Sequence, residues 1–354
     1  MTPSEAPAFS VWAWLRQRMG ALLASLLVAA GLAWLMHAGA LPVVPEASAF
    51  GHTRWWVVVV YSGTWVAMQL LRAARWQLLL APVTRIPLRR VIAVGLIGYG
   101  AMVVLPFRMG EAVRPALIRR GGAISLMAAS GTVVAERVID GLVLSLGLVM
   151  GLLLSRPLSP LPDHIGELPV QTAVVPGAAF SAASLFGGLF VAMAVLYWRR
   201  NWALGLVARL GNGGRAQLAR WLAGGVERLS DGLRFLPRLR FAGPFLLLTF
   251  LYWLAWASSA WLLLWGVGVT SPDLAHAAVV MGVVGLGVVV PNAPGFFGAF
   301  QLSAYAALAM FYPAAEIPGA GSAFVFLLYV VQIGGLIVLG GLALVTEHFA
   351  ARDA

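Results

Sequence analysis

Long apolar runs separated by short polar stretches form the main pattern along the chain. A bilayer core of ~30 Å is crossed by about 20 consecutive apolar residues in a helix. Six runs approach or exceed this length, and we expect full transmembrane helices at 19–38, 55–71, 123–155, 175–198, 245–267 and 324–345.

Three shorter apolar runs lie beside segments that contain proline and glycine. The run 91–105 has only 15 residues, about 22 Å of helix, and Pro106 follows it. The runs 274–290 and 296–311 flank the segment 291–295, which contains two prolines and a glycine. We therefore predict two re-entrant helical hairpins in addition to the six full spans.

Arginine is concentrated in two segments, 72–90 and 199–240. The positive-inside rule assigns both segments to the cytoplasm, so an even number of complete crossings must separate them. The hairpin around Pro106 then enters from the cytoplasmic face, the one around Pro291 enters from the outer face, and both termini are cytoplasmic. We expect an inner-membrane protein in which 199–240 is an amphipathic cytoplasmic segment that gathers anionic lipid; the alternative is a solvated linker.

The order span, hairpin, span occurs twice with opposite orientation. Residues 55–155 form the first half-repeat and residues 245–345 the second, within one polytopic membrane domain covering 1–354. This is the layout of an inverted-topology repeat, in which broken segments at corresponding positions point to the binding site. The predicted fold class is an all-α integral membrane protein.

Composition supports the membrane class and limits the chemistry. The chain is 61% hydrophobic and 10% charged, with a formal net charge of +11. Its basic residues lie at predicted cytoplasmic edges, which indicates contact with anionic lipid rather than nucleic acid. It has no cysteine, and its five histidines are scattered. We therefore expect no disulfide, no metal site and no cofactor.

The candidate site is a group of ionisable residues in an otherwise apolar region. Such groups cost about 2.5–3.5 kcal/mol each at membrane depth, so their default interpretation is functional. Arginine offers forked donors that suit a phosphate, and two acids four residues apart share a helix face while the arginine between them points elsewhere. One of these two acids is expected to pair with an arginine of the hairpin. The predicted substrate-binding residues here are Arg108, Glu111, Arg114, Glu136, Arg137 and Asp140.

The alternative for the hairpin residues is structural. Glu111 is three positions from both Arg108 and Arg114, so the three could form a self-satisfied cluster that closes the hairpin. In the second hairpin, Asn292 and Gln301 are expected to supply neutral donors to the substrate. The residues assigned to backbone architecture or structural motifs are Arg72, Arg75, Pro106, Gly110, Pro291, Pro294, Gly295 and Gly298.

Four segments in order resemble one family: 72–76 (RAARW), 105–114 (LPFRMGEAVR), 136–141 (ERVIDG) and 291–298 (PNAPGFFG). The chain resembles the lysylphosphatidylglycerol synthase transmembrane region, also called the flippase-like family. The resemblance implies movement of lipids or lipid-linked intermediates across bilayers. In bifunctional relatives an aminoacyltransferase domain follows, and we expect this chain to lack it. Gln301 stands where the family usually has Glu, which puts proton coupling through that position in doubt.

We therefore expect the protein to flip an anionic phospholipid or an isoprenoid-linked lipid between leaflets and not to be an enzyme. One alternative is a membrane-embedded enzyme acting on a lipid phosphate, although the sequence shows no Asp-rich metal cluster or nucleophile set. Another is a scaffold for a separate lipid-modifying enzyme. The expected partners are membrane lipids with anionic headgroups.

Overall fold

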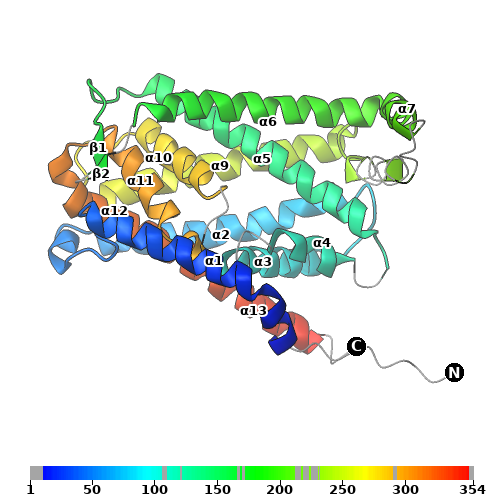
Figure 1. Cartoon of the computed structure of the whole chain (residues 1–354), viewed down its shortest axis with the longest axis horizontal. Coiled ribbons are helices and arrows are strands. Elements are labelled where there is room, and N and C mark those ends of the chain that lie inside the picture. Colours follow the sequence, from blue (N-terminus) through cyan, green and yellow to red (C-terminus); the bar gives the residue numbers. More distant parts are fainter. Residues whose placement is uncertain are drawn as a thin grey trace.

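A computed structural model shows a bundle of long helices lying roughly side by side (Figure 1). The residues described are 11–105, 110–119, 122–165, 168–169, 172–211, 217, 223–224, 230, 232–289 and 293–350. Within these, five helices are long and apolar enough to cross a membrane: α2 (Trp55–Leu80), α5 (Leu126–Leu154), α6 (Val174–Trp198), α9 (Leu239–Val267) and a composite last helix, Ala314–Glu347.

The sixth predicted span lies within α1 (Val11–Ala38), whose described apolar part is Leu27–Ala38. The composite last helix is built from η4 (Ala314–Glu316), η5 (Ile317–Gly321), α12 (Ser322–Tyr329), η6 (Val330–Gly334) and α13 (Gly335–Ala350). Shorter elements outside the predicted hairpins are η1 (Ala47–Phe50), α7 (Arg200–Gly211) and an antiparallel pair of short strands, β1 (His164–Ile165) and β2 (Leu168–Pro169).

The helices of the two predicted hairpins are shorter than the five candidate spans: α3 (Leu88–Val104), α4 (Val113–Ile118), α10 (Leu274–Gly287) and α11 (Ala299–Ala309). The pair α3–α4 lies in the half of the molecule nearer α7, and α10–α11 lies in the half nearer the β-hairpin (Figure 1). A short turn, η3 (Pro294–Phe296), precedes α11. The placement of the two pairs at opposite ends agrees with an inverted layout, and their re-entry into a membrane stays a prediction.

Local sequence explains where several helices begin and end. The side chain of Ser125 accepts a hydrogen bond from the backbone N–H of Ala128 at 3.1 Å and caps the start of α5. Asp273 does the same for α10, accepting from Ala275 at 3.0 Å. Gly268 ends α9 with a φ of 91°, a left-handed conformation that glycine adopts without strain.

The helices of the two halves pack against each other in a symmetric pattern. Helix α2 packs along α9, α3 packs along α13, and α5 packs along α10. Exchanging α2 with α9, α3 with α10, and α5 with the composite last helix leaves these pairings unchanged. Two repeats related by a pseudo-two-fold axis would produce this arrangement.

Two sequence expectations about boundaries were wrong. The second span was expected to end near residue 71, but α2 continues to Leu80 and contains Arg72 and Arg75. The helix continues past these charges because Glu136 and Asp140 neutralise Arg75 and the rings of Tyr99 and Tyr252 lie against Arg72. The last span was expected to begin at residue 324, but the composite last helix begins at Ala314 with the turns of η4 and η5.

Glycine allows the backbones of paired helices to touch. A methyl group on Gly340 of α13 would lie 2.9 Å from the Cα of Gly100 in α3 and 3.2 Å from the carbonyl oxygen of Leu96. In the corresponding pair, a methyl group on Gly282 of α10 would lie 2.7 Å from the Cβ of Leu148 in α5. Small residues at such contacts permit the close van der Waals packing that holds helices together in membranes.

This contact predicts opposite effects for two neighbouring glycines. Gly340→Ala should destabilise the protein by about 1–3 kcal/mol, because the methyl group would have to push the α3 backbone away. Gly341→Ala is the matched control, since a methyl group at this position would have no atom of the described residues within 4 Å. It should leave stability unchanged or raise it by up to about 1 kcal/mol through helix propensity. Thermal unfolding of both variants in detergent measures the difference, and equal unfolding temperatures would contradict the tight contact.

Candidate functional site

The site is organised by one face of α2. Trp65, Gln69, Arg72 and Trp76 recur at intervals of three or four residues, so they lie along the same side of the helix. Arg75 lies beside them and is buried. This face meets α5, which carries Glu136, Arg137 and Asp140 in its middle.

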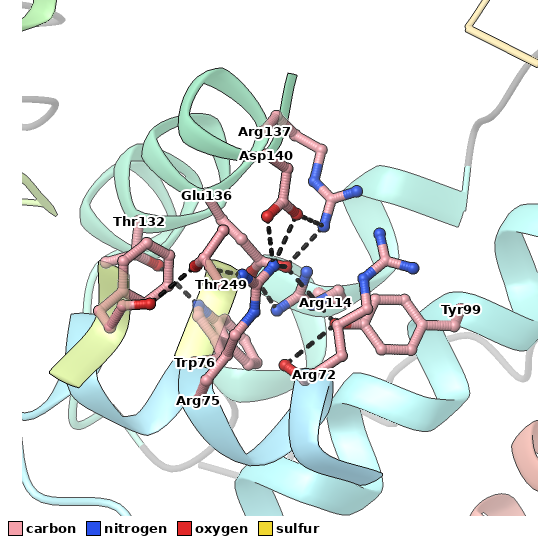
Figure 2. A network of polar contacts seen from close by, with 11 residues as sticks. Arg72, Arg75, Trp76, Tyr99, Arg114, Thr132, Glu136, Arg137, Asp140 and Thr249 are labelled. Atoms are coloured by element: carbon pink, nitrogen blue, oxygen red, sulfur yellow. Dashed lines mark hydrogen bonds and ion pairs between the residues drawn. The ribbon is translucent and has the colours of Figure 1, made fainter. Parts of the chain in front are cut away.

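Glu136 is the centre of a buried ion cluster (Figure 2). Its side chain is fully buried, and its carboxylate oxygens lie 2.7 Å from Nη2 of Arg114, 2.5 Å from Nη2 of Arg137 and 3.6 Å from Nη2 of Arg75. Arg114 comes from α4 and Arg75 from α2, so one carboxylate joins three elements. Burying this carboxylate without partners would be very unfavourable, and the three guanidinium groups compensate it.

Asp140 extends the cluster towards α9. Arg75 donates two hydrogen bonds from Nη2 to the carboxylate of Asp140, at 2.5 and 2.6 Å. Arg75 also donates from Nη1 to the hydroxyl of Thr249 on α9. The second contact of Asp140 is with Arg137, at 3.4 Å. The cluster therefore fixes α2, α4, α5 and α9 relative to one another.

Aromatic rings surround the arginines. The guanidinium of Arg114 lies 4.2 Å from the ring centre of Trp76 and 5.0 Å from that of Tyr99. The guanidinium of Arg72 lies 4.5 Å from the ring centre of Tyr99 and 5.7 Å from that of Tyr252. Cation–π contacts of this kind strengthen when water is excluded, so they hold the arginine side chains without neutralising them.

Glycine makes room for these large side chains. A methyl group on Gly98 of α3 would clash with the side chain of Arg114, and one on Gly110 would clash with the backbone of Ala101 and Met102. These two glycines let α4 lie against α3 and let Arg114 reach Glu136.

A cavity of about 370 Å³ opens beside the cluster. Its polar lining comes from Gln69, Arg72, Glu111, Arg137, Asp140 and Gln332. Its aromatic lining comes from Trp65, Phe186, Tyr252, Trp253, Trp256, Phe296 and Phe300, and aliphatic residues of α5, α10, η6 and α13 complete the wall. The cavity is thus amphipathic, and both half-repeats contribute to it.

The transmembrane region of lysylphosphatidylglycerol synthase is the family whose sequence pattern matches this chain, over residues 22–341. The chain belongs to this family. No curated protein matched the chain in a sequence comparison. Membership and the five apolar helices make it a multi-pass membrane protein of the lysylphosphatidylglycerol synthase or flippase-like type.

The residues predicted from this family's first hairpin and α5 lie together, but not all of them face the cavity. Glu111, Arg137 and Asp140 line it. Arg114 and Glu136 are 1% and 0% exposed and are paired with each other, as the sequence led us to expect for one acid and one hairpin arginine. The alternative of a self-satisfied cluster of Arg108, Glu111 and Arg114 stays a prediction, because Arg108 lies outside the described residues; the buried partner of Arg114 is Glu136 of α5.

The predicted residues of the second hairpin are placed differently. Gln301 is 3% exposed, and its Oε1 accepts a hydrogen bond from the backbone N–H of Gly298 at 2.8 Å. It is not among the residues that line the cavity. Gly295 and Gly298 have φ of 71° and 81°, and Pro294 begins η3, so these three residues shape the backbone before α11. Arg108, Asn292, Pro106 and Pro291 lie outside the described residues.

Sequence reasoning missed part of the site. Arg72 was expected to be a structural motif residue, yet it lines the cavity. Arg75 had the same expectation, and its partners Glu136 and Asp140 in the ion cluster were not foreseen. Gln69 and Gln332 were not singled out, although an amide within an apolar span was a usable signal. The expectation that Glu136 and Arg137 point to different sides was wrong, because the long arginine side chain bends back to Glu136.

The cluster predicts a large stability loss when its central acid is neutralised. Glu136→Gln leaves Arg75, Arg114 and Arg137 facing one remaining carboxylate of the described cluster, at an expected cost of about 3–5 kcal/mol. Asp163→Asn is the control, because its ion pair with His164 is exposed and should contribute little. Yield and unfolding temperature in detergent measure both. A Glu136→Gln protein as stable as the control variant would contradict the structural role.

Proposed function

We propose that this protein translocates phosphate-bearing lipids between the leaflets of the membrane. The proposal rests on the amphipathic cavity, which has charged groups on one part of its wall and aromatic and aliphatic groups over the rest. A lipid has the same division between headgroup and chains. A scaffold would not require such a cavity, and the family to which the chain belongs supports a lipid-related activity.

The arginines of the cavity suit a phosphate. The Nε atoms of all four arginines of the cluster are buried and have no hydrogen-bond partner in the described part of the chain, so only the cavity separates Arg75 and Arg114 from Arg72 and Arg137. Both residues line the cavity, and their guanidinium groups lie on the same side of the cluster (Figure 2). Guanidinium groups donate forked, charge-assisted hydrogen bonds to phosphate oxygens. We therefore assign phosphate binding to Arg72 and Arg137 and a structural role to Arg75 and Arg114.

The apolar wall suits lipid chains. Val284, Val288 and Val289 of the segment 274–289 lie on it, and Ile333 and Leu336 lie on the composite last helix. Val289 is 48% exposed, so the wall continues to the outer surface of the protein at this point. Acyl or isoprenoid chains can lie along this wall and remain in contact with the bilayer while the headgroup occupies the cavity.

Movement of one half against the other would carry the headgroup across. The cavity is formed by α2 and α5 from the first half and by α9, α10 and the last helix from the second. In inverted-repeat transporters, alternating access arises from rocking of one repeat against the other around a fixed site. The two predicted re-entrant hairpins, α3–α4 and α10–α11, would thin the barrier from both faces.

The proposed orientation places the α7 end in the cytoplasm of a cell with the protein in its inner membrane. Asn201→Cys in α7 and Asp163→Cys in the loop before α6 are both at exposed positions of a chain without native cysteine. An impermeant thiol reagent added to intact cells should label position 163 and spare position 201, because arginine-rich loops stay on the inside. The reverse labelling pattern would overturn the orientation.

A neutral substitution of Arg72 tests the proposed activity. Arg72→Gln should lower the rate of lipid movement in reconstituted vesicles roughly 10- to 100-fold, the range expected for losing a charge-assisted hydrogen bond. The matched control is Arg54→Gln. Arg54 also stacks on an aromatic ring, 3.9 Å from the centre of Trp265, but does not line the cavity.

The wild-type assay decides the function and the variants decide the site. Loss of a fluorescent phospholipid signal on adding a membrane-impermeant quencher reports how much lipid has reached the outer leaflet. Wild-type vesicles that show no faster exchange than protein-free vesicles would contradict translocation. Equal rates for Arg72→Gln and Arg54→Gln would contradict phosphate binding at Arg72 and leave translocation standing.

A further inference from the structure

Helices α5 and α10 close one side of the cavity by packing glycines against larger side chains. A methyl group on each of these glycines would lie 2.6–2.9 Å from the facing side chain, so the two helices are in close contact there. The facing pairs are Gly151 with Val279, Leu148 with Gly282 and Leu144 with Gly285. Successive pairs are three or four residues apart on both helices, as a continuous seam requires.

The seam does not continue to the next pair. Three residues further along each helix lie Gly141 of α5 and Val288 of α10, and both line the cavity. A methyl group on Gly141 would clash with the ring of Phe186 on α6; the three atoms nearest to it all belong to this ring and none to α10. Phe186 is also the one described residue of α6 that lines the cavity. A glycine thus leaves a window in the cavity wall, and one aromatic ring from a third helix fills it.

Helix α6 is held to the bundle more loosely than the other candidate spans. It packs along α5 at the edge of the bundle (Figure 1). Only 11% of its apolar stretch is buried inside the described structure, whereas the other four candidate spans have 33–50%. Segments with few buried contacts open locally at low free-energy cost, so α6 can withdraw its ring from the window without unfolding the bundle.

A pair of glycines weakens α6 directly beside the ring. Gly187 and Gly188 follow Phe186 in the middle of the helix. Packing does not require either glycine. A methyl group on Gly188 would meet no atom of the described residues within 4 Å, and one on Gly187 would make an ordinary contact with Leu142 at 4.0 Å. Glycine lowers helix stability and permits bending, so the pair suits a hinge next to the window.

We propose that the gap between Gly141 and Val288 is a lateral window through which lipid enters the cavity from the bilayer, and that Phe186 is its gate. Val289, beside the window, lines the cavity and is 48% exposed, so the cavity wall reaches the outer surface of the protein there. Bending of α6 at its glycine pair withdraws the ring, the headgroup passes inwards, and the chains remain in the window. The inference rests on the proposed function, since it names the route by which the substrate reaches the same cavity.

The first experiment measures access from the bilayer and does not depend on transport. Ile333→Cys gives the cysteine-free chain one thiol, on the cavity wall formed by the last helix; Leu336→Cys is used if the first variant does not fold. In reconstituted vesicles, its alkylation by N-dodecylmaleimide, which dissolves in the bilayer, is compared with its alkylation by a sulfonated maleimide, which stays in water. Phe186→Ala should raise the first rate roughly 3- to 10-fold, the factor that the packing of one aromatic ring represents, and leave the second rate unchanged.

Two further variants separate a gate from a general loosening of the helix. Phe180→Ala is the matched control, because Phe180 also belongs to α6 but is 53% exposed and does not line the cavity. It should leave both rates unchanged. Gly141→Leu added to Phe186→Ala refills the window from α5 and should restore the wild-type rate, since its side chain would occupy the place of the missing ring. Equal dodecylmaleimide rates for Phe186→Ala and Phe180→Ala would overturn the inference, as would an equal rise with both reagents.

The hinge predicts that stability and access change in opposite directions. Gly187→Ala combined with Gly188→Ala should raise the unfolding temperature in detergent, because alanine favours the helix, and should slow dodecylmaleimide alkylation roughly 3- to 10-fold. Gly147→Ala is the matched control, since Gly147 lies in α5 and a methyl group there would meet no atom of the described residues within 4 Å. It should raise stability without slowing alkylation. Equal alkylation rates for the two proteins would overturn the hinge.

Lipid movement tests whether the window is the route. Two lipids with one headgroup are compared in reconstituted vesicles, one with straight palmitoyl chains and one with branched phytanoyl chains. Phe186→Ala should speed the branched lipid roughly 3- to 10-fold and the straight lipid less, because wider chains need the ring to move further. An equal effect on both lipids would overturn the window as the route of the lipid. If the wild-type protein moves neither lipid, the proposed function fails, and alkylation then decides alone whether the window and its gate exist.

Discussion

The structure depends on the neutralisation of charge inside an apolar protein. Glu136 is fully buried, and its neutralisation requires arginines from α2 and α4 as well as its neighbour on α5. Removing water from these groups is expensive, so each is tolerated only where the others are present. The ion cluster therefore specifies which helices meet. Hydrophobic contacts are non-directional and would not by themselves select one arrangement of the helices.

The same constraint separates the arginines into two classes. Arg75 and Arg114 are almost fully buried and paired with Asp140 and Glu136, so their charges are used within the fold. Arg72 is held by the rings of Tyr99 and Tyr252, which orient its guanidinium without neutralising it. A charge positioned in this way remains available to a ligand. Arg72 and Arg75 are three residues apart on one helix, yet aromatic rings orient Arg72 towards the cavity and carboxylates neutralise Arg75 within the fold.

The sequence contained enough information for the spans and for the region of the site. Apolar length predicted the long helices, and four of the predicted site residues, Arg114, Glu136, Arg137 and Asp140, do meet one another. The sequence did not reveal which arginines pair with Glu136, because several arginines lie within reach of it and helical spacing alone does not rank them. It also missed Gln69 and Gln332, which come from spans 263 residues apart and face one cavity only because α2 packs near the last helix. Such a site is a property of tertiary contact, and no local pattern encodes it.

Gln301 shows how a neutral amide fits the turn before α11. Its side chain accepts a hydrogen bond from the backbone N–H of Gly298 at 2.8 Å and so satisfies a donor at the start of α11. A glutamate would accept the same bond, but it would add a negative charge at a position that is 3% exposed. The amide keeps the cap and avoids that charge. The charged chemistry of the described cavity is accordingly concentrated on α2, α5 and the segment before α4, whereas the second half contributes aromatic rings and neutral amide and indole groups. The helix packing of the two halves is thus symmetric, whereas the charged side chains that line the cavity come from the first half.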